Sequence, residues 1–292
     1  MCFAISLAGF SHHRINDVKK NEPGVLAFLK DFKAKGYLEN TLLIVMGDHG
    51  LRFGEVRKLV QGKLEERLPL YSMVVPSWFP SRYPDVFKIM QTNTARFTSW
   101  FDVHATFRHI LNFPTPPADM SRGISLFTEI PSNRTCKDAG IGNHWCPCLQ
   151  WSTVDVKHSQ IQNAALAAVE FMNNLLSSEK ESSMYCANLT LKTVNLAQLE
   201  RPNAEVVKTH LRKASRFKQS KEYFCRYQLQ FVTLPNEGVF EATVKYHKNR
   251  FIVNTGISRI NKYSDQPNCV AARLPFVRKF CLCKDYKGSL SE

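Results

Sequence analysis

The sequence predicts an α/β fold in two parts: a parallel-rich sheet with flanking helices, followed by a smaller disulfide-bearing α+β domain. For the first part, an apolar β-rich run at 41–46 follows a helix-like segment and an earlier strand-like run at 2–7. Strand–helix–strand order is typical of parallel sheets. For the second part, a long amphipathic segment at 156–176 precedes four strand-like runs, which predicts a helix followed by an antiparallel meander.

Composition divides the 292 residues in the same way. Eight of the nine cysteines follow Pro131, and only Cys2 precedes it. Residues 1–130 hold 16 Lys and Arg against 12 Asp and Glu (+4), and the remainder holds 23 against 13 (+10). We therefore predict a core over 1–130, a cysteine-rich linker over 131–152 and an α+β domain over 153–292.

The predicted elements of the first part follow from periodicity and from helix start and stop signals. Apolar residues at helical spacing between Val25 and Phe32 predict a helix that ends near Gly36. A short strand is expected at 69–75, helices at 83–96 and 100–111, and a final short element at 122–127. In the helix at 100–111, the expected inner face consists of Phe101, His104, Ala105, Phe107 and Ile110.

The predicted strands of the second part lie at 189–197, 223–233, 239–246 and 251–260. Asn236-Glu-Gly between the middle two is typical of a hairpin turn.

The cysteines of the second half support two interpretations. An even number is typical of disulfides, and the candidates are Cys136, Cys146, Cys148, Cys186, Cys225, Cys269, Cys281 and Cys283. The rival is a zinc site, although the Cys-x-Cys pairs at 146/148 and 281/283 lack the usual spacer of two to four residues. We favour disulfides formed in an oxidising compartment.

Two glycosylation sequons, at Asn133 and Asn188, also indicate a secretory route. The chain has no apolar run long enough to span a membrane. It begins without a recognisable signal segment, so a secreted protein with this sequence would be N-terminally incomplete. Because of the cysteines and the sequons, we expect the full-length parent to be secreted, or to face the lumenal or extracellular side of a membrane.

The basic charge favours anionic partners, such as anionic esters or acidic glycans. The segment from Lys208 to Arg226 holds seven Lys and Arg against one Glu. A solvated basic surface is the alternative, and no nucleic-acid-binding motif accompanies the charge.

The most informative stretch is Gly47-Asp48-His49-Gly50, which directly follows the apolar run at 41–46. A carboxylate and an imidazole at the end of a buried strand require partners, because burying an unpaired charge is costly. Ligands in open α/β sheets bind at the carboxyl ends of strands. We predict that Asp48 and His49 ligate a metal; capping and core packing are the alternatives.

A longer pattern surrounds this stretch. TLLIVMGDHGLRFG followed by QGKLEERLPLYSMVVPSWF resembles the metazoan domain-of-unknown-function 229 family, whose core is similar to alkaline phosphatases and sulfatases. SHHRIND, SWFDVHATFRHIL, RGISLF and RTCKDAGIGNHWCPCL extend the resemblance.

The resemblance implies a metal-dependent phosphate or sulfate ester hydrolase fold, with Asp48 and His49 as ligands of zinc, calcium, magnesium or manganese. It implies substrate contacts for His12 and Lys63, although either residue could be an exposed surface group. Glu65, Glu66 and Arg67 are expected to form ion pairs, and Asp102 and His104 to pack or cap.

The chain departs from the superfamily before Asp48. Its first 47 residues offer neither an aspartate that ends a strand nor a nucleophile, so we expect a C-terminal portion of a larger protein that is inactive alone. Whether the chain is part of an enzyme therefore stays open. The alternative is a non-catalytic secreted or ectodomain binding protein, whose basic C-terminal half binds anionic glycans or partner proteins.

Overall fold

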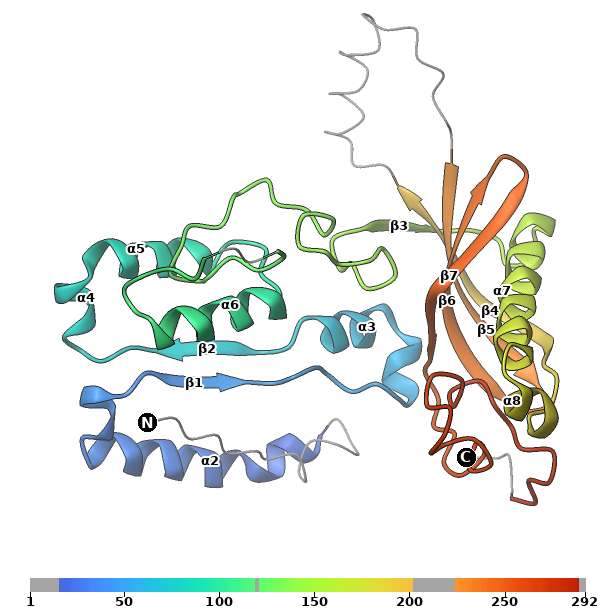
Figure 1. Cartoon of the computed structure of the whole chain (residues 1–292), viewed down its shortest axis with the longest axis horizontal. Helices are drawn as coiled ribbons and strands as arrows, with labels where there is room; N and C mark the ends of the chain where they lie inside the picture. Colours follow the sequence, from blue (N-terminus) through green and yellow to red (C-terminus); the bar gives the residue numbers. More distant parts are fainter. Residues whose placement is uncertain (1–15, 119–120, 202–223, 289–292) are drawn as a thin grey trace, which may run out of the picture. The chain divides into compact units, whose positions relative to one another are not determined.

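The structure is a computed structural model that describes residues 16–118, 121–201 and 224–288 (Figure 1). The strand predicted over residues 2–7, His12, Cys2 and most of the basic segment at 208–226 lie outside this range. The chain separates into two compact units: unit 1 contains residues 1–51 and 65–142, and unit 2 contains residues 52–64 and 143–292.

Unit 1 is mainly helical, with one pair of short strands. Its elements are α2 (Asp17–Ala34), the 3₁₀ turn η1 (Tyr37–Asn40), β1 (Leu43–Met46), β2 (Tyr71–Val74), α4 (Phe79–Arg82), α5 (Pro84–Asn93) and α6 (Trp100–Leu111). The predicted helices before residue 36 and at 83–96 and 100–111 are confirmed, as are the strands at 41–46 and 69–75. Helix α3 (Val60–Arg67) begins in unit 2 and ends in unit 1.

The predicted parallel-rich sheet is wrong for the described residues. Strand β1 pairs antiparallel with β2, with Leu43 opposite Val74 and Met46 opposite Tyr71. The Gly47 N–H donates to the carbonyl of Leu70 at 2.9 Å, so the chain leaves β1 and enters β2 at the same end of the pair. A connection that returns to the same end gives antiparallel pairing, whatever the spacing of the apolar residues.

Helix α6 has the predicted bounds, but of its predicted inner face only Ala105 is buried and Ile110 half-buried. Phe101, His104 and Phe107 are exposed. The buried face carries Asp102, Val103, Ala105, Thr106 and His109. Polar side chains occupy this face because the backbone of the neighbouring segment, residues 122–130, needs hydrogen-bond partners.

That segment, residues 122–130, is an irregular strap rather than the short regular element predicted at 122–127. Its backbone bonds to side chains of α5 and α6. Asp102 accepts from Ile124 N–H at 2.8 Å, Thr106 Oγ1 accepts from Leu126 N–H at 2.8 Å, and Asn93 Oδ1 accepts from Ile130 N–H at 3.0 Å. Buried backbone groups outside regular structure require such partners.

Unit 2 is a five-stranded antiparallel meander, covered on one face by a long helix (Figure 1). Its elements are η2 (Glu55–Lys58), β3 (Gln150–Thr153), α7 (Ser159–Ser177), α8 (Lys180–Tyr185), β4 (Thr190–Arg201), β5 (Phe224–Leu234), β6 (Gly238–His247) and β7 (Arg250–Arg259). The predicted helix and the four-strand meander are confirmed, whereas β3 was not predicted. Glu237 has a φ of 45° in the predicted hairpin turn.

Alternation along the strands separates an apolar face from a polar one. Leu229 lies opposite Ala242, and Phe231 opposite Phe240. These residues are fully buried with the α7 residues Ala168 and Met172 in one hydrophobic core. Burial of an aromatic or aliphatic side chain contributes about 1.5–3 kcal/mol, so this face accounts for much of the stability of unit 2.

Candidate functional site

The turn after β1 is shaped by its second glycine. The N–H of Gly50 donates to the carbonyl of Glu66 at 3.1 Å. A Cβ atom at Gly50 would lie 2.3 Å from the carbonyl oxygen of Glu65, so no larger residue fits without moving the backbone. Close packing at Gly50 therefore fixes the backbone that carries Asp48 and His49.

Asp48 and His49 are held towards each other by local hydrogen bonds. The N–H of His49 donates to Asp48 Oδ1 at 2.9 Å, and His49 Nδ1 lies 2.7 Å from the carbonyl oxygen of Gly50. His49 Nε2 lies 3.4 Å from Asp48 Oδ2. The ring nitrogen and the second carboxylate oxygen thus converge on one point.

The pair is not buried as the sequence suggested. The side chain of Asp48 is 84% exposed and that of His49 34% exposed, and β1 is at most half-buried along its length. The argument from an unpaired buried charge is therefore wrong for this pair. This exposure leaves His49 Nε2 and Asp48 Oδ2 accessible to an ion from solvent.

Lys63 belongs to unit 2, where it lies against the polar face of the sheet. Its side chain is 9% exposed, its Nζ donates to Gln228 Oε1, and it lies 4.0 Å from Glu241 Oε2. Its ammonium group also lies 5.4 Å from the ring centre of Trp151. The alternative of an exposed loop lysine is wrong.

The cavity beside Lys63 is too small for an ester substrate. It measures about 10 Å³, which is room for about one water molecule. Among the described residues, Gln228 Nε2 is buried without a hydrogen-bond partner. A substrate contact for Lys63 would require this packing to open.

The expected ion pair of the GKLEERLP motif is present in unit 1. Arg67 Nε lies 3.9 Å from Glu66 Oε2, and both side chains are less than 10% exposed. These residues fix the helix end that faces Gly50, rather than offering groups for chemistry.

Comparison with protein families decides the relationship of this chain. The family described as "Protein of unknown function (DUF229)" matches residues 3–195, well over half of the 292 residues. The chain belongs to the DUF229 family. No curated protein and no solved structure matches it.

In this DUF229 protein, Asp102 has the capping role expected of it, and His104 is exposed. Asp102 Oδ2 accepts from the backbone N–H of Ser99 at 2.7 Å, and both carboxylate oxygens accept from the Arg134 guanidinium at 2.7 and 2.9 Å. Asp102 is fully buried, so this is a structural ion pair.

A serine–histidine pair lies nearby but does not supply a nucleophile. Ser125 Oγ lies 2.9 Å from His109 Nδ1, and His109 Nε2 lies 3.2 Å from the carbonyl of Pro114. A carbonyl only accepts, so Nε2 carries the proton and Nδ1 accepts from Ser125. Both residues are only 4% exposed, and their bonds hold the 122–130 strap on α6.

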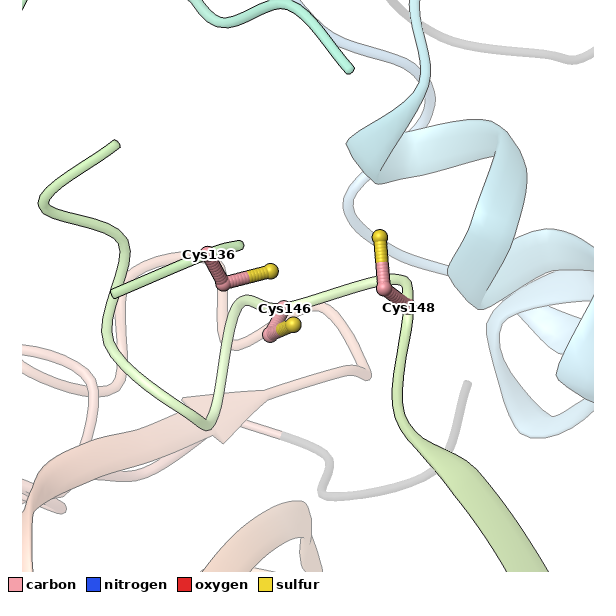
Figure 2. A group of neighbouring side chains, drawn as sticks. All are labelled: Cys136, Cys146 and Cys148. Atoms are coloured by element: carbon pink, nitrogen blue, oxygen red, sulfur yellow. The ribbon is translucent and has the colours of Figure 1, made fainter. Parts of the chain in front are cut away.

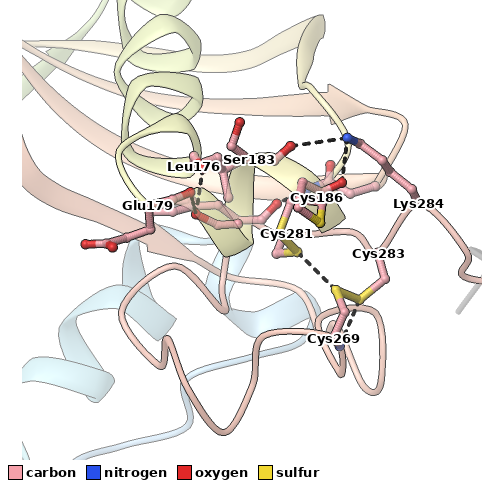
Figure 3. Close-up of a disulfide and its surroundings, with 12 residues drawn as sticks. Leu176, Glu179, Ser183, Cys186, Cys269, Cys281, Cys283 and Lys284 are labelled. Carbon is pink, nitrogen blue, oxygen red and sulfur yellow. Dashed lines mark hydrogen bonds between the residues drawn. A yellow bond between two sulfur atoms is a disulfide. The ribbon is translucent and has the colours of Figure 1, made fainter.

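Six of the eight disulfide candidates of the DUF229 chain are oxidised. Figure 3 shows the bonds Cys186–Cys281 and Cys269–Cys283, and the Sγ atoms of Cys269 and Cys281 lie 3.8 Å apart. Cys136 and Cys146 are also disulfide-bonded. Oxidised sulfurs are not thiolate ligands, which removes the zinc alternative for 281/283.

The other two candidates, Cys148 and Cys225, carry free thiols. The sulfurs of Cys136, Cys146 and Cys148 lie within 4.8 Å of one another (Figure 2). Within that group Cys148 carries the one thiol, because Cys136 and Cys146 are both disulfide-bonded. Cys225 lies on β5 opposite Tyr246, which offers no thiol.

Asn133 and Asn188 are both exposed, as attached glycans would require, and their glycosylation stays a prediction. Within the described part of this DUF229 protein, no helix is both long and apolar enough for a membrane crossing. The disulfides are consistent with a secreted or extracellular protein.

Proposed function

We propose that this DUF229 chain contributes to a metal-dependent phosphate or sulfate ester hydrolase of the alkaline-phosphatase-like kind, and that Asp48 and His49 ligate one divalent cation. The observation that carries the proposal is the 3.4 Å approach of His49 Nε2 to Asp48 Oδ2, with Nδ1 bonded to the Gly50 carbonyl. The resemblance around GDHGLRFG and GKLEERLP supplies the reaction class.

The hydrogen bond to Gly50 supports a ligand role because it selects the tautomer. A carbonyl oxygen only accepts, so Nδ1 carries the proton and the lone pair of neutral His49 lies on Nε2. Histidines that bind metals usually donate their other N–H to a carbonyl or carboxylate in this way. The ring therefore presents its free nitrogen on the side of Asp48.

The separation of the two atoms also suits one cation. Two ligands about 2.0–2.2 Å from a tetrahedral metal lie about 3.3–3.6 Å apart, whereas adjacent ligands of an octahedral magnesium lie about 3.0 Å apart. The 3.4 Å separation fits the first case, and it also fits adjacent ligands of calcium, which lie about 3.3–3.7 Å apart. Because imidazole suits zinc better than calcium or magnesium, zinc is the cation we favour among the four.

A bound cation would supply Lewis-acid stabilisation of the anionic group being transferred. Asp48 and His49 would hold it, and their exposure leaves the site open to a substrate. A catalytic centre needs about three protein ligands, and the described residues bring only these two together. We therefore expect the chain alone to show no turnover of aryl phosphate or aryl sulfate esters.

An ordinary His–Asp ion pair is the rival, and metal affinity distinguishes the two. We expect zinc, in competition with a chromophoric chelator, to bind at least about tenfold more weakly after Asp48→Asn or His49→Gln. The parent chain should carry Cys148→Ser and Cys225→Ser, which remove the free thiols of the described residues, and also Cys2→Ser, so that thiols do not bind zinc. His104→Gln, an exposed histidine of the same unit, is the matched control and should change nothing.

An affinity that changes less than about twofold in both Asp48→Asn and His49→Gln would contradict the proposal.

The glycan-binding alternative rests on the basic segment from Lys208 to Arg226, and the described residues of that segment do not support it. Of the seven basic residues between 208 and 226, only Arg226 is described, and it is ion-paired with Glu200.

A further inference from the structure

The end of β7 and the segment that follows it in unit 2 are unusually basic. Between Gly256 and Lys284 the chain carries six Lys and Arg and a single acidic residue, Asp265. The last residues of β7 begin this segment, and the rest forms the C-terminal coil, drawn in red in Figure 1, whose cysteines form the two disulfides.

Three of the six cations have partners that account for them. Lys279 Nζ donates to the carbonyl of Ile257 at 2.6 Å. Arg273 Nη1 lies 3.2 Å from Glu181 Oε1. Lys284 Nζ donates to the carbonyls of Ser183 and Met184 at the end of α8, at 3.2 and 2.8 Å, where the helix dipole favours a positive charge.

The other three have no carboxylate partner in the described part of the chain. We call them the Tyr263 cluster: Arg259, Lys262 and Arg278. The guanidinium carbons of Arg259 and Arg278 lie 5.2 and 5.9 Å from the ring centre of Tyr263. Arg259 also bonds to the carbonyl of Lys279 at 3.4 Å, and Lys262 adjoins Tyr263 in the chain.

Arg259 makes this cluster electrostatically unusual. It is 4% exposed, and its hydrogen bonds go to neutral oxygens, including Gln266 Oε1 at 2.9 Å and Asn261 Oδ1 at 3.1 Å. Desolvation lowers the pKa of Arg259 to about 10, so it remains charged at neutral pH. A buried cation without a counter-charge is costly, and the Tyr263 ring offsets only part of that cost.

The side chains of Lys262 and Arg278 are exposed, so the cluster presents positive charge to solvent. A sulfate or phosphate group placed beside them would supply the missing counter-charge. Arginine is well suited to such a group because its N–H donors match two oxygens at once.

The chemistry of the unit points to the source of that anion. Disulfides form in oxidising compartments such as the outside of the cell, so we take a sulfated glycan rather than a nucleic acid as the anion. We infer that the Tyr263 cluster is a binding surface for a sulfated glycan, independent of Asp48 and His49.

Heparin binding by the full chain tests this inference. In Lys262→Gln/Arg278→Gln, we expect an about fivefold rise in the Kd for a heparin oligosaccharide at physiological salt, and earlier elution from a heparin column. The control is Lys192→Gln/Arg273→Gln in the same unit. It removes the same charge from exposed residues that are paired with Glu237 and Glu181, and it should bind nearly as tightly as the parent.

Three outcomes would overturn the inference. One is equal weakening by the control pair, which would indicate net charge alone. Another is a loss of heparin-column retention in Lys213→Gln/Lys218→Gln alone, which would assign binding to the 208–226 segment. The third is equal binding of non-sulfated hyaluronan. Circular dichroism melting curves should be unchanged for Lys262→Gln/Arg278→Gln and for Lys192→Gln/Arg273→Gln, since these four side chains are exposed.

Discussion

Asp102→Asn is expected to destabilise unit 1 by about 3–5 kcal/mol, because it leaves the buried guanidinium of Arg134 without its counter-charge. Both side chains are at most 3% exposed. The carboxylate also accepts from Ser99 and Ile124 N–H groups, so the amide nitrogen of asparagine would oppose a donor at one of its contacts. Loss of these bonds frees both the start of α6 and the 122–130 strap.

Hydrogen exchange of α6 amides measures this effect locally. Protection of α6 should fall in Asp102→Asn, whereas the β6 amides of unit 2 should be unchanged. His104→Ala, an exposed change two residues further along the same helix, should alter stability by less than about 0.5 kcal/mol. Unchanged α6 protection in Asp102→Asn would contradict the structural role of this ion pair.

Cys186→Ser/Cys281→Ser is expected to destabilise unit 2 by about 3–5 kcal/mol, because this disulfide closes a loop of 95 residues. It ties the end of α8 to the C-terminal coil, where Ala187 N–H donates to the carbonyl of Leu282 at 2.8 Å. Denaturant unfolding under non-reducing conditions gives the change in free energy.

The matched control for the disulfide is Cys148→Ser/Cys225→Ser, which removes two free thiols and should cost little. Alkylation of the native chain without reductant should label Cys148 and Cys225 and spare the six disulfide-bonded cysteines. If both double variants unfolded at the same denaturant concentration, the Cys186–Cys281 bond would have no structural role.

Sequence periodicity predicted most of the elements because local patterns determine them. The helix at 100–111 and the β5–β6 hairpin around Asn236 agree with the structure. Pairing direction was not predictable in this way: an apolar run indicates a strand but says nothing about its neighbour, so the antiparallel β1–β2 pair contradicts the parallel prediction.

The buried face of α6 shows a second limit. Phe101 and Phe107 are the more apolar residues, yet Asp102, Thr106 and His109 are buried because the 122–130 strap needs their hydrogen bonds. That demand comes from a segment distant in sequence and cannot be read from helical spacing. The burial of Lys63 beside Gln228 has the same origin.

Of the candidate site, the sequence predicted the proximity of Asp48 and His49 but not what positions them. The bond from His49 Nδ1 to the Gly50 carbonyl and the Gly50–Glu66 contact depend on backbone geometry. The exposure of Asp48 likewise could not be inferred from an apolar run that forms only a two-stranded pair.

Long-range ¹H–¹⁵N NMR of the His49 ring tests the metal-pair proposal most directly. In the metal-free chain we predict a proton on Nδ1. Titration with zinc should then shift the Nε2 resonance while Nδ1 stays protonated, and Asp48→Asn should remove most of that shift. An Nε2 resonance that zinc leaves unmoved, or a proton on Nε2 in the metal-free chain, would contradict the account.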